Sequence, residues 1–516
     1  MVPTAPEISA WEKSEFRALV ARAAQSRTRF GFGYLDYDGQ LDPDHDLELW
    51  INCRMTHVFC LAALREQAEA EPGPHSARQL ATFGIKCLRE HFFDTAHGGF
   101  FSRLTAATGL PSGPGADRKE AYAHAFVLLA ASSGIQAGIT GAEELFALAC
   151  TAHENFFWEE QYGLVCESWD RAFTESENYR GVNANMHTLE ASLAAWDATG
   201  NPRWLAKASQ IINFVLGQAA CTGWHIPEHF SATWQPLPDF NRDNPADPFR
   251  PYGYTPGHGV EWSRLILQFW AAVETHAQQA AALADTAGAV ATSNKVAISS
   301  EAPTPSGTAR SDADTGSPFG KLPARVFAQL PQLAHQLFAT AIRDGWNIDG
   351  APGFVYTIAP DRKPIVHERM HWTVCEAISA AAAFATYSET HPEMITTASA
   401  VSHVVADATS DAAPISEVAP VSEVSLVSDA APILDPAPVP EAAYFRDWHR
   451  QFIAYARTYL VHEPGLWIHE LDAQNQPSRI TWPGKPDVYH AAQAMLMDGL
   501  PLSPCFAGAL KLTAQA

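Results

Sequence analysis

The chain has 516 residues, of which 47% are hydrophobic and 18% charged, so it is long and apolar enough to bury a large core. Its formal net charge of −23 at pH 7 repels nucleic acid and anionic lipid, and we expect neither as a partner. No basic segment followed by an apolar run opens the chain, no stretch approaches about 18 uninterrupted apolar residues, and the cysteines are dispersed without a C-x-x-C pair. These features predict a soluble cytoplasmic protein with reduced thiols.

Apolar residues recur at three- and four-residue spacing along most of the chain, which is typical of helices with one buried face. The clearest stretches are residues 47–64, 121–131, 186–198 and 204–216, and similar ones begin near Trp11, Ala77, Ala142, Gly257, Leu322, Trp372, Ala442 and Asp487. The pattern predicts about twelve helices. Gly200 and Pro202 mark one of the breaks, because glycine favours a helix end and proline the next helix start. Such short connections favour antiparallel neighbours.

Longer aromatic and polar loops separate these helices. They cover residues 92–103, 166–180, 224–255, 353–371 and 465–486. Short alternating stretches in the loops, such as 354–357, predict small hairpins and not one continuous sheet. Long loops in a compact protein are usually functional. We therefore predict an all-α fold in which the helices form a closed ring and the loops gather over one mouth.

Two stretches differ from the rest in composition. Residues 281–317 are rich in Ala, Ser, Thr, Pro and Gly, and residues 397–440 repeat themselves, since the pentapeptide at Asp411 returns at Asp429. Such segments cannot bury enough apolar surface to offset chain entropy. We interpret both as disordered insertions without catalytic residues, with a docking role as the alternative, in a single catalytic domain over residues 1–516.

Polar side chains interrupt three of the apolar helical stretches. Arg54 needs an anionic or hydroxylated partner, which is either a structural ion pair or a ligand. Tyr122 is a weak signal on its own. Asn183 and His187 open another helix, where Asn185 is a candidate cap and His187 has no structural explanation.

His258 and His490 each lie where a glycine-containing turn leads into a helix. Glu261 follows His258 by three positions, and a carboxylate near an imidazole raises its pKa and fixes its tautomer. No acidic residue follows His490 within one turn, so we expect His490 to be the more neutral of the two. Buried structural histidines are common, but several at helix starts indicate one convergent acid–base site.

Residues 367–371 match the H-E-x-x-H pattern of zinc peptidases. The pattern holds zinc only when both histidines lie one turn apart on one helix face. Here it follows Pro360, Pro364 and a strand-like stretch, and we expect the helix to begin only near His371. We therefore predict no metal site and no cofactor.

Together these segments resemble the N-acylglucosamine 2-epimerase superfamily, and within it the branch of mannose and sulfoquinovose isomerases. The matching stretches are residues 50–57, 122–124, 167–170, 179–187, 228–230, 234–250, 255–262, 372–376, 469–472 and 482–490. The resemblance covers nearly the whole chain except the two insertions. It implies an (α/α)6 barrel with a sugar pocket at one end, without metal or nucleotide.

The resemblance also implies roles for single residues. His258 and His490 match the paired acid–base histidines of the family. The residues that match its pocket lining are Arg54, Tyr122, Asn183, His187, Arg250, Glu261, Trp372 and Glu376. Sulfoquinovose isomerases carry glutamine where this chain has His469 and Pro486, and these departures favour a neutral hexose such as mannose.

The expected activity is that of an aldose–ketose isomerase that interconverts D-mannose and D-fructose, and also lyxose and xylulose, through a cis-enediol. Two imidazoles on opposite sides of an open-chain sugar can move the protons without a metal. The nearest alternatives are a 2-epimerase of N-acylglucosamine, N-acylmannosamine or a disaccharide, and a sulfoquinovose isomerase. A non-catalytic binding module and a glycoside hydrolase that uses Glu261 and Glu376 are further alternatives. A monosaccharide is the expected partner, and self-association stays open.

Overall fold

An inner ring of helices surrounds the axis of the protein. The computed structural model describes residues 4–69, 76–293, 322, 324–395, 436–482 and 484–515. The inner helices are α2 (Leu49–Glu69), α4 (Ala121–Gln136), α6 (Val182–Thr199), α8 (Pro256–Ser293), α11 (His371–Thr390) and α13 (Tyr489–Met497). Each packs against the next, and α13 returns to α2, so the ring is closed.

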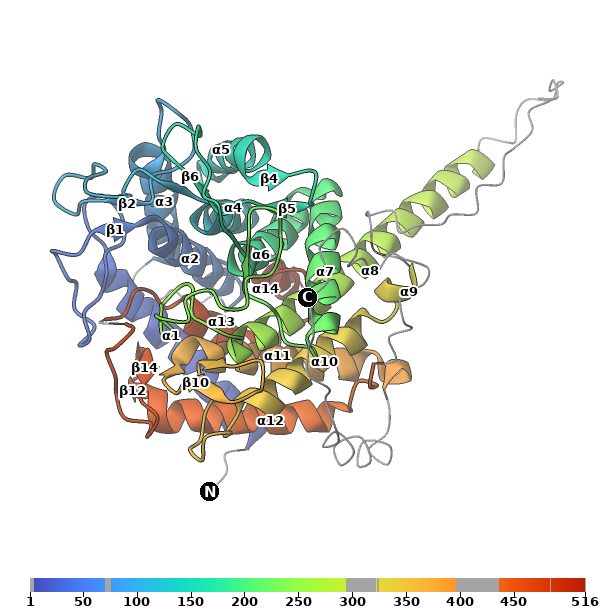
Figure 1. Cartoon of the computed structure of the whole chain (residues 1–516). Coiled ribbons are helices and arrows are strands. Elements are labelled where there is room, and N and C mark those ends of the chain that lie inside the picture. The colour runs from blue at the N-terminus through green and yellow to red at the C-terminus, as the bar shows by residue number, and fades with distance from the viewer. Residues whose placement is uncertain are drawn as a thin grey trace.

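An outer ring covers the inner one (Figure 1). Its helices are α1 (Ala5–Ala23), α3 (Ala77–Cys87), α5 (Ala142–Ala152), α7 (Arg203–Cys221), α10 (Leu330–Gly345) and α12 (Ala442–Tyr455). Helices α3, α5, α7, α10 and α12 each pack on the inner helix that precedes them, and α1 packs on α13, so the two ends of the chain close the barrel. The predicted (α/α)6 barrel is confirmed.

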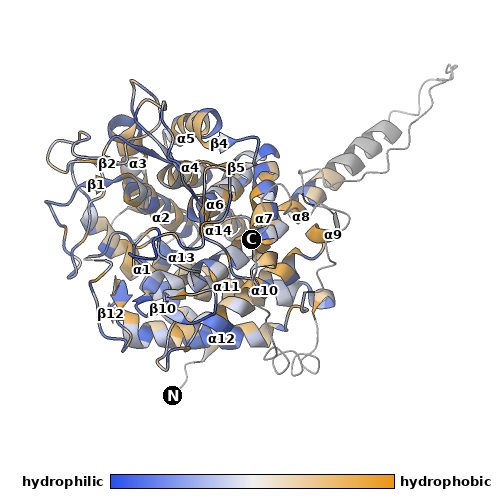
Figure 2. Cartoon of the chain, viewed as in Figure 1, coloured by the Kyte–Doolittle hydropathy of each residue, from blue (hydrophilic) through white to orange (hydrophobic). Residues whose placement is uncertain are grey.

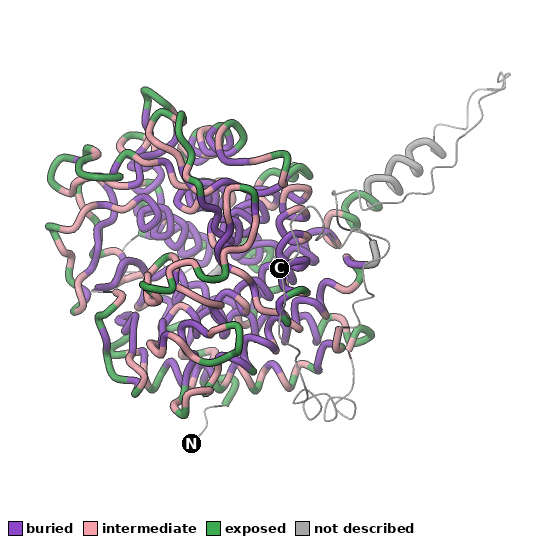
Figure 3. The backbone as a smooth tube through the Cα atoms, viewed as in Figure 1, coloured by how far each residue is buried: buried purple, intermediate pink, exposed green. Residues whose placement is uncertain are grey.

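The two rings differ in sequence because they differ in exposure. Inner helices such as α4 and α11 are buried on nearly all faces and are rich in the small residues Ala and Ser. Outer helices such as α3 and α12 bury one stripe and expose the other, as amphipathic helices do. Hydrophobic and buried residues therefore concentrate in the helices of the barrel, while the loops that connect them are more polar and more exposed (Figures 2 and 3).

Short strands, paired two by two, occupy the loops, as predicted in place of one continuous sheet. Four pairs precede inner helices or join the loops around them: β1 (Leu47–Glu48) with β2 (Arg103–Leu104), β3 (Lys119–Glu120) with β6 (Ser168–Trp169), β7 (Arg180–Gly181) with β8 (His229–Phe230), and β11 (Arg369–Met370) with β14 (Glu470–Leu471). Three more are local hairpins: β4 (Trp158–Glu159) with β5 (Leu164–Val165), β9 (Thr357–Ile358) with β10 (Pro364–Val366), and β12 (Val461–Glu463) with β13 (Leu466–Trp467). All the pairs are antiparallel.

The loops also cap the inner helices through the backbone. The first amide of a helix has no partner within the helix and must find one elsewhere. The amides of Leu49, Ala121, Val182 and His371 donate to the carbonyls of Ser102, Glu167, Glu228 and His469, respectively, at 2.8–3.1 Å. The strand pairs therefore bring residues from the following loop to the start of each of these helices, at the same end of the barrel.

A helix that the sequence analysis did not predict closes the opposite end. Helix α14 (Phe506–Gln515) packs against α2, α4 and α6. The Cys505 thiol, just before it, donates to Asp197 near the C-terminal end of α6, and the Lys511 ammonium donates to Gln136 at the end of α4. The barrel is thus open to ligand at the end where the inner helices begin.

The remaining short elements adjust the boundaries. The stretch predicted from Leu322 is split into α9 (Ala324–Phe327) and α10. Short helical turns extend several helices or stand after them, namely η1 (Ala24–Ser26), η2 (Leu88–Phe92), η3 (His153–Phe157), η5 (Pro392–Met394) and η7 (Ala456–Leu460). Within the described residues, no helix combines the length and apolarity needed to cross a bilayer.

The structure describes only the edges of the two predicted insertions, and at these edges it shows ordered chain. Helix α8 continues to Ser293 and projects from the barrel (Figure 1), so the beginning of the 281–317 stretch is helical. At the other insertion, Val439 is buried and bridges to Ile395, and the Pro440 carbonyl accepts a hydrogen bond from Ser388. Residues 397–440 therefore include an end that packs on the barrel. The rest of both insertions lies outside the described residues.

Candidate active site

A pocket lies where the inner helices begin. Eight of the ten predicted site residues line it: Arg54, Tyr122, Asn183, His187, His258, Glu261, Trp372 and His490. They come from all six inner helices, and each lies in the first two turns of its helix. Residues spread over more than 430 positions of sequence therefore converge because the barrel aligns the six helix starts.

Two histidines in this pocket are each held by a glutamate. The Nδ1 atom of His258 lies 2.9 Å from Glu228, and the Nδ1 atom of His490 lies 2.8 Å from Glu376. A carboxylate accepts from Nδ1–H and so fixes the tautomer, which leaves Nε2 of each ring as the basic nitrogen. Trp372 lies between the two rings, with centroid distances of 5.2 Å to His258 and 5.9 Å to His490.

These pairs correct two expectations from the sequence. The carboxylate that holds His258 is Glu228 and not Glu261. His490 has no acidic residue on its own helix nearby, but Glu376 reaches it from α11. Glu376 does not line the pocket, because it lies behind His490 and its other oxygen accepts two hydrogen bonds from Arg264. Periodicity along one helix carries no information about partners that another helix supplies.

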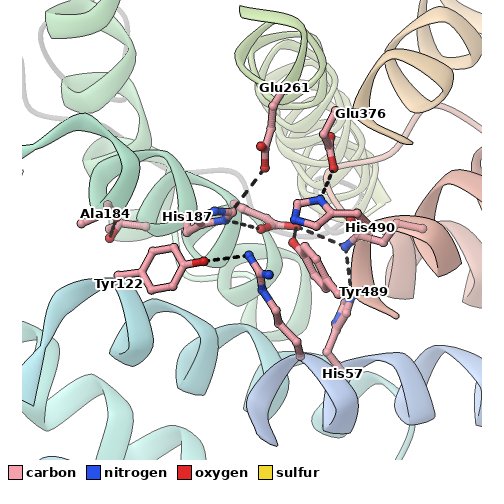
Figure 4. Close-up of polar contacts among 12 residues, drawn as sticks. His57, Tyr122, Ala184, His187, Glu261, Glu376, Tyr489 and His490 are labelled. Carbon is pink, nitrogen blue, oxygen red and sulfur yellow. Dashed lines mark hydrogen bonds and ion pairs between the residues drawn. The ribbon is translucent and has the colours of Figure 1, made fainter. Parts of the chain in front are cut away.

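A third imidazole is embedded in a buried network (Figure 4). The Nδ1 atom of His187 lies 3.2 Å from Glu190 and 3.9 Å from Glu261. Glu190 also accepts hydrogen bonds from the Tyr489 hydroxyl and from Gln493. Burial lowers the pKa of His187 to about 4, against the effect of Glu190, so this imidazole is neutral at pH 7.

Burial and neighbouring charge set the other protonation states. Burial, with Arg54 next in importance, holds the pKa of His490 well below 6.5, so this ring is a neutral base at pH 7. Burial and then the nearby Glu376 raise the pKa of Glu261 well above its ordinary value. Burial also raises the pKa of Glu376, although Arg264 opposes the effect. Removal from water therefore disfavours the charged form of both carboxyl groups, and Arg264 offsets part of that cost.

Arg54 supplies a fixed positive charge at the wall of the pocket. Its guanidinium donates to the Tyr122 hydroxyl at 2.9 Å and to Asp487 at 3.3 Å. It also packs 4.4 Å from the centre of the Phe126 ring. Its Nε atom is buried and has no partner among the described residues. Arg54 is thus partly an ion pair, as one reading of the sequence predicted, and partly a donor at the pocket.

Arg250 is the second predicted residue that lies outside the pocket. It lines an adjoining chamber that shares Trp50, Tyr122, Asn183, Phe249 and Trp482 with the pocket. Its guanidinium is committed to Glu177 at 2.7 Å and to Glu167 at 3.2 Å. Arg250 therefore joins its own loop to the loop that carries Glu167 and Glu177, and it does not reach the pocket itself.

The zinc-peptidase pattern is a false match, as expected. His367 is 45% exposed and binds Asp349, whereas His371 is buried at the first position of α11. Strand β11 separates the two histidines, so they share no helix face. A different group, His187, Glu190 and Glu261, has ligand atoms within 4.8 Å of one another. The Arg264 guanidinium, 3.9 Å from Glu261, opposes a cation there.

Several site residues were not singled out from the sequence. Glu228, Glu190 and Tyr489 hold the histidines or their neighbours. His371 and His469 line the pocket, although the sequence marked them only as part of the zinc pattern and as a departure from sulfoquinovose isomerases. Glu228 and His469 lie in loops, where no periodicity marks them. The only available signal was their place in stretches that match the family.

The whole chain was compared with known proteins. The family model for N-acylglucosamine 2-epimerase matches residues 31–302, 325–411 and 430–494. The chain belongs to this family. It is 37% identical over 506 residues to a D-mannose isomerase of Thermobifida fusca, which covers 97% of this chain and 96% of that protein. It is 34% identical over 502 residues to a D-mannose isomerase of Pseudomonas cannabina pv. alisalensis, and the match covers 97% of this chain and 94% of that protein.

Solved structures support the fold of this N-acylglucosamine 2-epimerase family member. A crystal structure of D-mannose isomerase matches with a TM-score of 0.64 at 20% identity, over 95% of this chain and 97% of that one. The cellobiose 2-epimerase of Bacillus thermoamylovorans matches with a TM-score of 0.61 at 16% identity, over 98% of this chain and 99% of that one. At these identities the structural likeness concerns the barrel alone.

Proposed function

We propose that this protein is an aldose–ketose isomerase that interconverts D-mannose and D-fructose. The observation that carries the proposal is the pair of glutamate-held histidines, His258 and His490, which face one pocket with Trp372 between them. The two curated relatives named above act, by their names, on D-mannose. The neutral imidazole of His490 and the aromatic side chains of the pocket suit an uncharged sugar.

The proposed reaction moves two protons and no other atoms. His490 Nε2 removes the proton from C2 of the open-chain aldose, and the electron pair forms the C1–C2 double bond of a cis-enediol as O1 gains a proton. The O2 proton then leaves, a carbonyl forms at C2, and the imidazolium returns its proton to C1. His258 assists ring opening and the transfer of protons between the two oxygens. General acid–base steps of this kind each contribute about 10²–10⁴-fold.

The pocket also stabilises the charge that develops on the enediol oxygens. Arg54 places a buried guanidinium at the pocket wall. The inner helices all begin here, so the partial positive charge of each helix start is directed at the ligand. Both contributions act among buried side chains, where charge interactions are stronger than in solvent.

The two alternative activities, 2-epimerase and glycoside hydrolase, require different arrangements of catalytic groups. A 2-epimerase would share proton removal at C2 and return the proton to the same carbon, so product analysis separates it from an isomerase. A glycoside hydrolase needs two carboxyl groups that flank the scissile bond. Glu376 does not suit that role, because both its oxygens are committed to His490 and Arg264. The absence of ketose from D-mannose would reject the proposal in favour of the epimerase.

Hydrogen exchange at C2 tests the histidine roles. In deuterated water, His490→Asn should lose both fructose formation and C2 exchange by about 10³-fold, because the base is gone. His258→Asn should lose fructose formation but retain some exchange. His449→Asn is the matched control, since His449 is buried and lies 3.1 Å from Glu12 at a distance from the pocket. Near-normal exchange in His490→Asn would reverse or reject the assignment.

We further propose that the reaction needs no metal and takes place in the cytoplasm. The acid–base residues described above account for every proton transfer without a Lewis acid. All eight cysteines are free thiols, in keeping with a reducing compartment. Cell fractionation tests the location, because the protein should be recovered in the cytoplasmic fraction. Treatment with a chelator tests the metal independence, because the activity should remain.

A further inference from the structure

A buried arginine lies behind the proposed base. Arg264 follows Glu261 by three positions on α8, so the two side chains lie on the same face of that helix and Arg264 is deeper in the barrel. Its side chain is 1% exposed, and it is not among the residues that line the pocket. Any effect of Arg264 on the reaction must therefore pass through other residues.

Arg264 is connected to His490 through one carboxylate. The Nε and Nη2 atoms of Arg264 both donate to the same oxygen of Glu376, at 3.0 and 2.8 Å. The other oxygen of Glu376 lies 2.8 Å from Nδ1 of His490. The three side chains come from α8, α11 and α13, which are consecutive helices of the inner ring. The charge of Arg264 is thus separated from the imidazole by a single carboxylate.

The far end of the barrel fixes the orientation of Arg264. Its Nη1 atom donates to the side chain of Gln268 at 2.8 Å, and the Gln268 amide donates to the Ser503 carbonyl at 3.3 Å. The guanidinium also lies 5.6 Å from the centre of the ring of Phe506, the first residue of α14. All three nitrogens of the planar group therefore have an acceptor, so the side chain has one preferred orientation.

The surroundings of Arg264 are acidic. Glu376 lies at 2.8 Å and Glu261 at 3.9 Å, and the charge of Glu190 on α6 also acts on the guanidinium. Three buried carboxyl groups thus surround this one cation. The other charged or titratable groups that face Glu376 and His490 are Arg54 of α2, His187 of α6, His371 of α11, His469 in the loop before β14 and Tyr489 of α13.

The charge of Arg264 affects how readily Glu376 and His490 together take up a proton. With Arg264 present, its charge balances the carboxylate, and an added proton leaves a buried net positive charge. Without Arg264, the same proton would neutralise a buried negative charge. Burial disfavours net charge, so Arg264 lowers the proton affinity of the pair, whichever group holds the proton. Burial raises the pKa of Glu376 and lowers that of His490, and Arg264 acts downward on both.

We propose that Arg264 is a positioning residue, which holds the Glu376 carboxylate against His490 and sets the pH range in which His490 can act as a base. The inference rests on the proposed function, in which His490 removes the C2 proton. Arg264 does not line the pocket, so its loss should change the pH dependence and kcat more than KM.

The test follows kcat/KM for D-mannose against pH in Arg264→Gln. The acidic limb of this profile reports the protonation of the essential base in the free enzyme. Loss of the buried positive charge should move the limb to higher pH by about 1–3 units, because the pair then binds its proton more readily. KM on the plateau should change by less than about threefold. Arg264→Lys keeps the charge, and its limb should stay within about 0.5 unit of that of the wild type.

Arg180→Gln is the matched control. Arg180 is also buried and donates twice to one glutamate, Glu159, but it does not line the pocket. Its acidic limb should coincide with that of the wild type. An unmoved limb in Arg264→Gln would overturn the inference, and so would an equal shift in Arg180→Gln, since the shift would then follow from the loss of any buried arginine.

Should Arg264→Gln fail to fold, Gln268→Glu provides a second comparison. Glutamate has nearly the shape of glutamine, keeps the acceptor for Arg264 and adds a negative charge beside it. The acidic limb should again move to higher pH, by about one unit. A limb that stays at the wild-type position in this variant would reject the role of Arg264.

A titration of the His490 ring separates this inference from the proposed function, because it needs no turnover. In protein made with isotope-labelled histidine, the NMR signal of His490 is assigned by its loss in His490→Asn and followed against pH without substrate. Arg264→Gln should raise the midpoint by the same 1–3 units or so. If the wild type forms no ketose from D-mannose, the proposed function fails, and equal midpoints in the wild type and Arg264→Gln would still reject this inference.

Discussion

At the scale of the residue, the site depends on carboxylates that hold imidazoles. Glu228 and Glu376 fix the tautomers of His258 and His490, and Glu190 does the same for His187. All three glutamates are buried, which removes their charge from water. Glu190 accepts hydrogen bonds from Tyr489 and Gln493 as well as from His187, and Glu376 pairs with Arg264, so these two have further partners that offset the cost of burial. The glutamates thus fix the orientation of the histidines, and the free energy needed to bury their charge is offset by the hydrogen bonds and ion pairs that they make.

Glu228→Gln should lower kcat by about 10–100-fold with little change in KM. Glutamine still fills the space, but it no longer stabilises the imidazolium of His258 and it allows the ring to flip. Glu12→Gln is the matched control, because Glu12 pairs with His449 between α1 and α12 and should leave kcat unchanged. Steady-state kinetics on mannose measure both variants. A change of less than twofold in Glu228→Gln would show that Glu228 does not tune His258.

Chelation should leave the activity intact. His187, Glu190 and Glu261 are close enough to ligate a cation, but the His187–Glu190 hydrogen bond and the Arg264 guanidinium already satisfy much of their charge. After dialysis against EDTA we expect more than about nine-tenths of the initial rate, since no proposed step requires a Lewis acid. Loss of activity that zinc or manganese restores would reject the metal-free mechanism.

At the scale of the element, each inner helix contributes its N-terminal end to the site and the rest of its length to the core. The outer helices carry the amphipathic faces that bury this core. One of them, α10, contains His335, whose two ring nitrogens are buried without a partner among the described residues. Its ring lies against Phe384 of α11 and Phe445 of α12.

His335→Phe should reduce the acid sensitivity of folding. Burial lowers the pKa of His335 to about 4, below its unfolded value near 6.5. The unfolded chain therefore binds the extra proton first, and the stability contributed by the neutral ring is lost as pH falls from about 6.5 to about 4. The variant should lose about 2–3 kcal/mol less between pH 7 and pH 4.5. Urea unfolding measures this, with His462→Phe, at an exposed site, as the control. Equal slopes in His335→Phe and the wild type would contradict the prediction.

At the scale of the whole molecule, the barrel is closed by contacts between the two ends of the chain. Helix α1 packs on α13, and α14 covers the end opposite the pocket. The pocket is therefore enclosed by segments from the entire chain, and local damage at either terminus should affect the ring as a whole.

Deletion of residues 298–318 and 400–433 should leave kcat within about twofold and the melting temperature within a few degrees. Their composition lacks the apolar surface that a packed segment requires. The flanks of the second deletion are already adjacent, because Ile395 bridges to Val439, so a short linker can join them. Circular dichroism and kinetics measure the result. A soluble but inactive deletion variant would show that these residues contribute to the site.

The amino-acid sequence by itself determined the fold class, the twelve principal helices and eight of the pocket residues. Helical periodicity is a local property, and the starts of inner helices are marked by polar residues in otherwise apolar stretches, as at Arg54 and His187. The two histidines that we propose for the acid–base chemistry, His258 and His490, also follow glycine-containing turns. The family resemblance, which the comparisons confirm, placed them together before any contact was known.

Only the tertiary structure decided which carboxylate serves which histidine. Glu228 reaches His258 across 30 positions, and Glu376 reaches His490 across 114, so neither pairing follows from spacing along one helix. The same holds for the stacking of His371 on His469 and for the displacement of Arg250 into the adjoining chamber. These contacts arise because ring closure and strand pairing bring distant loops to one mouth, and that arrangement is a property of the packed barrel as a whole.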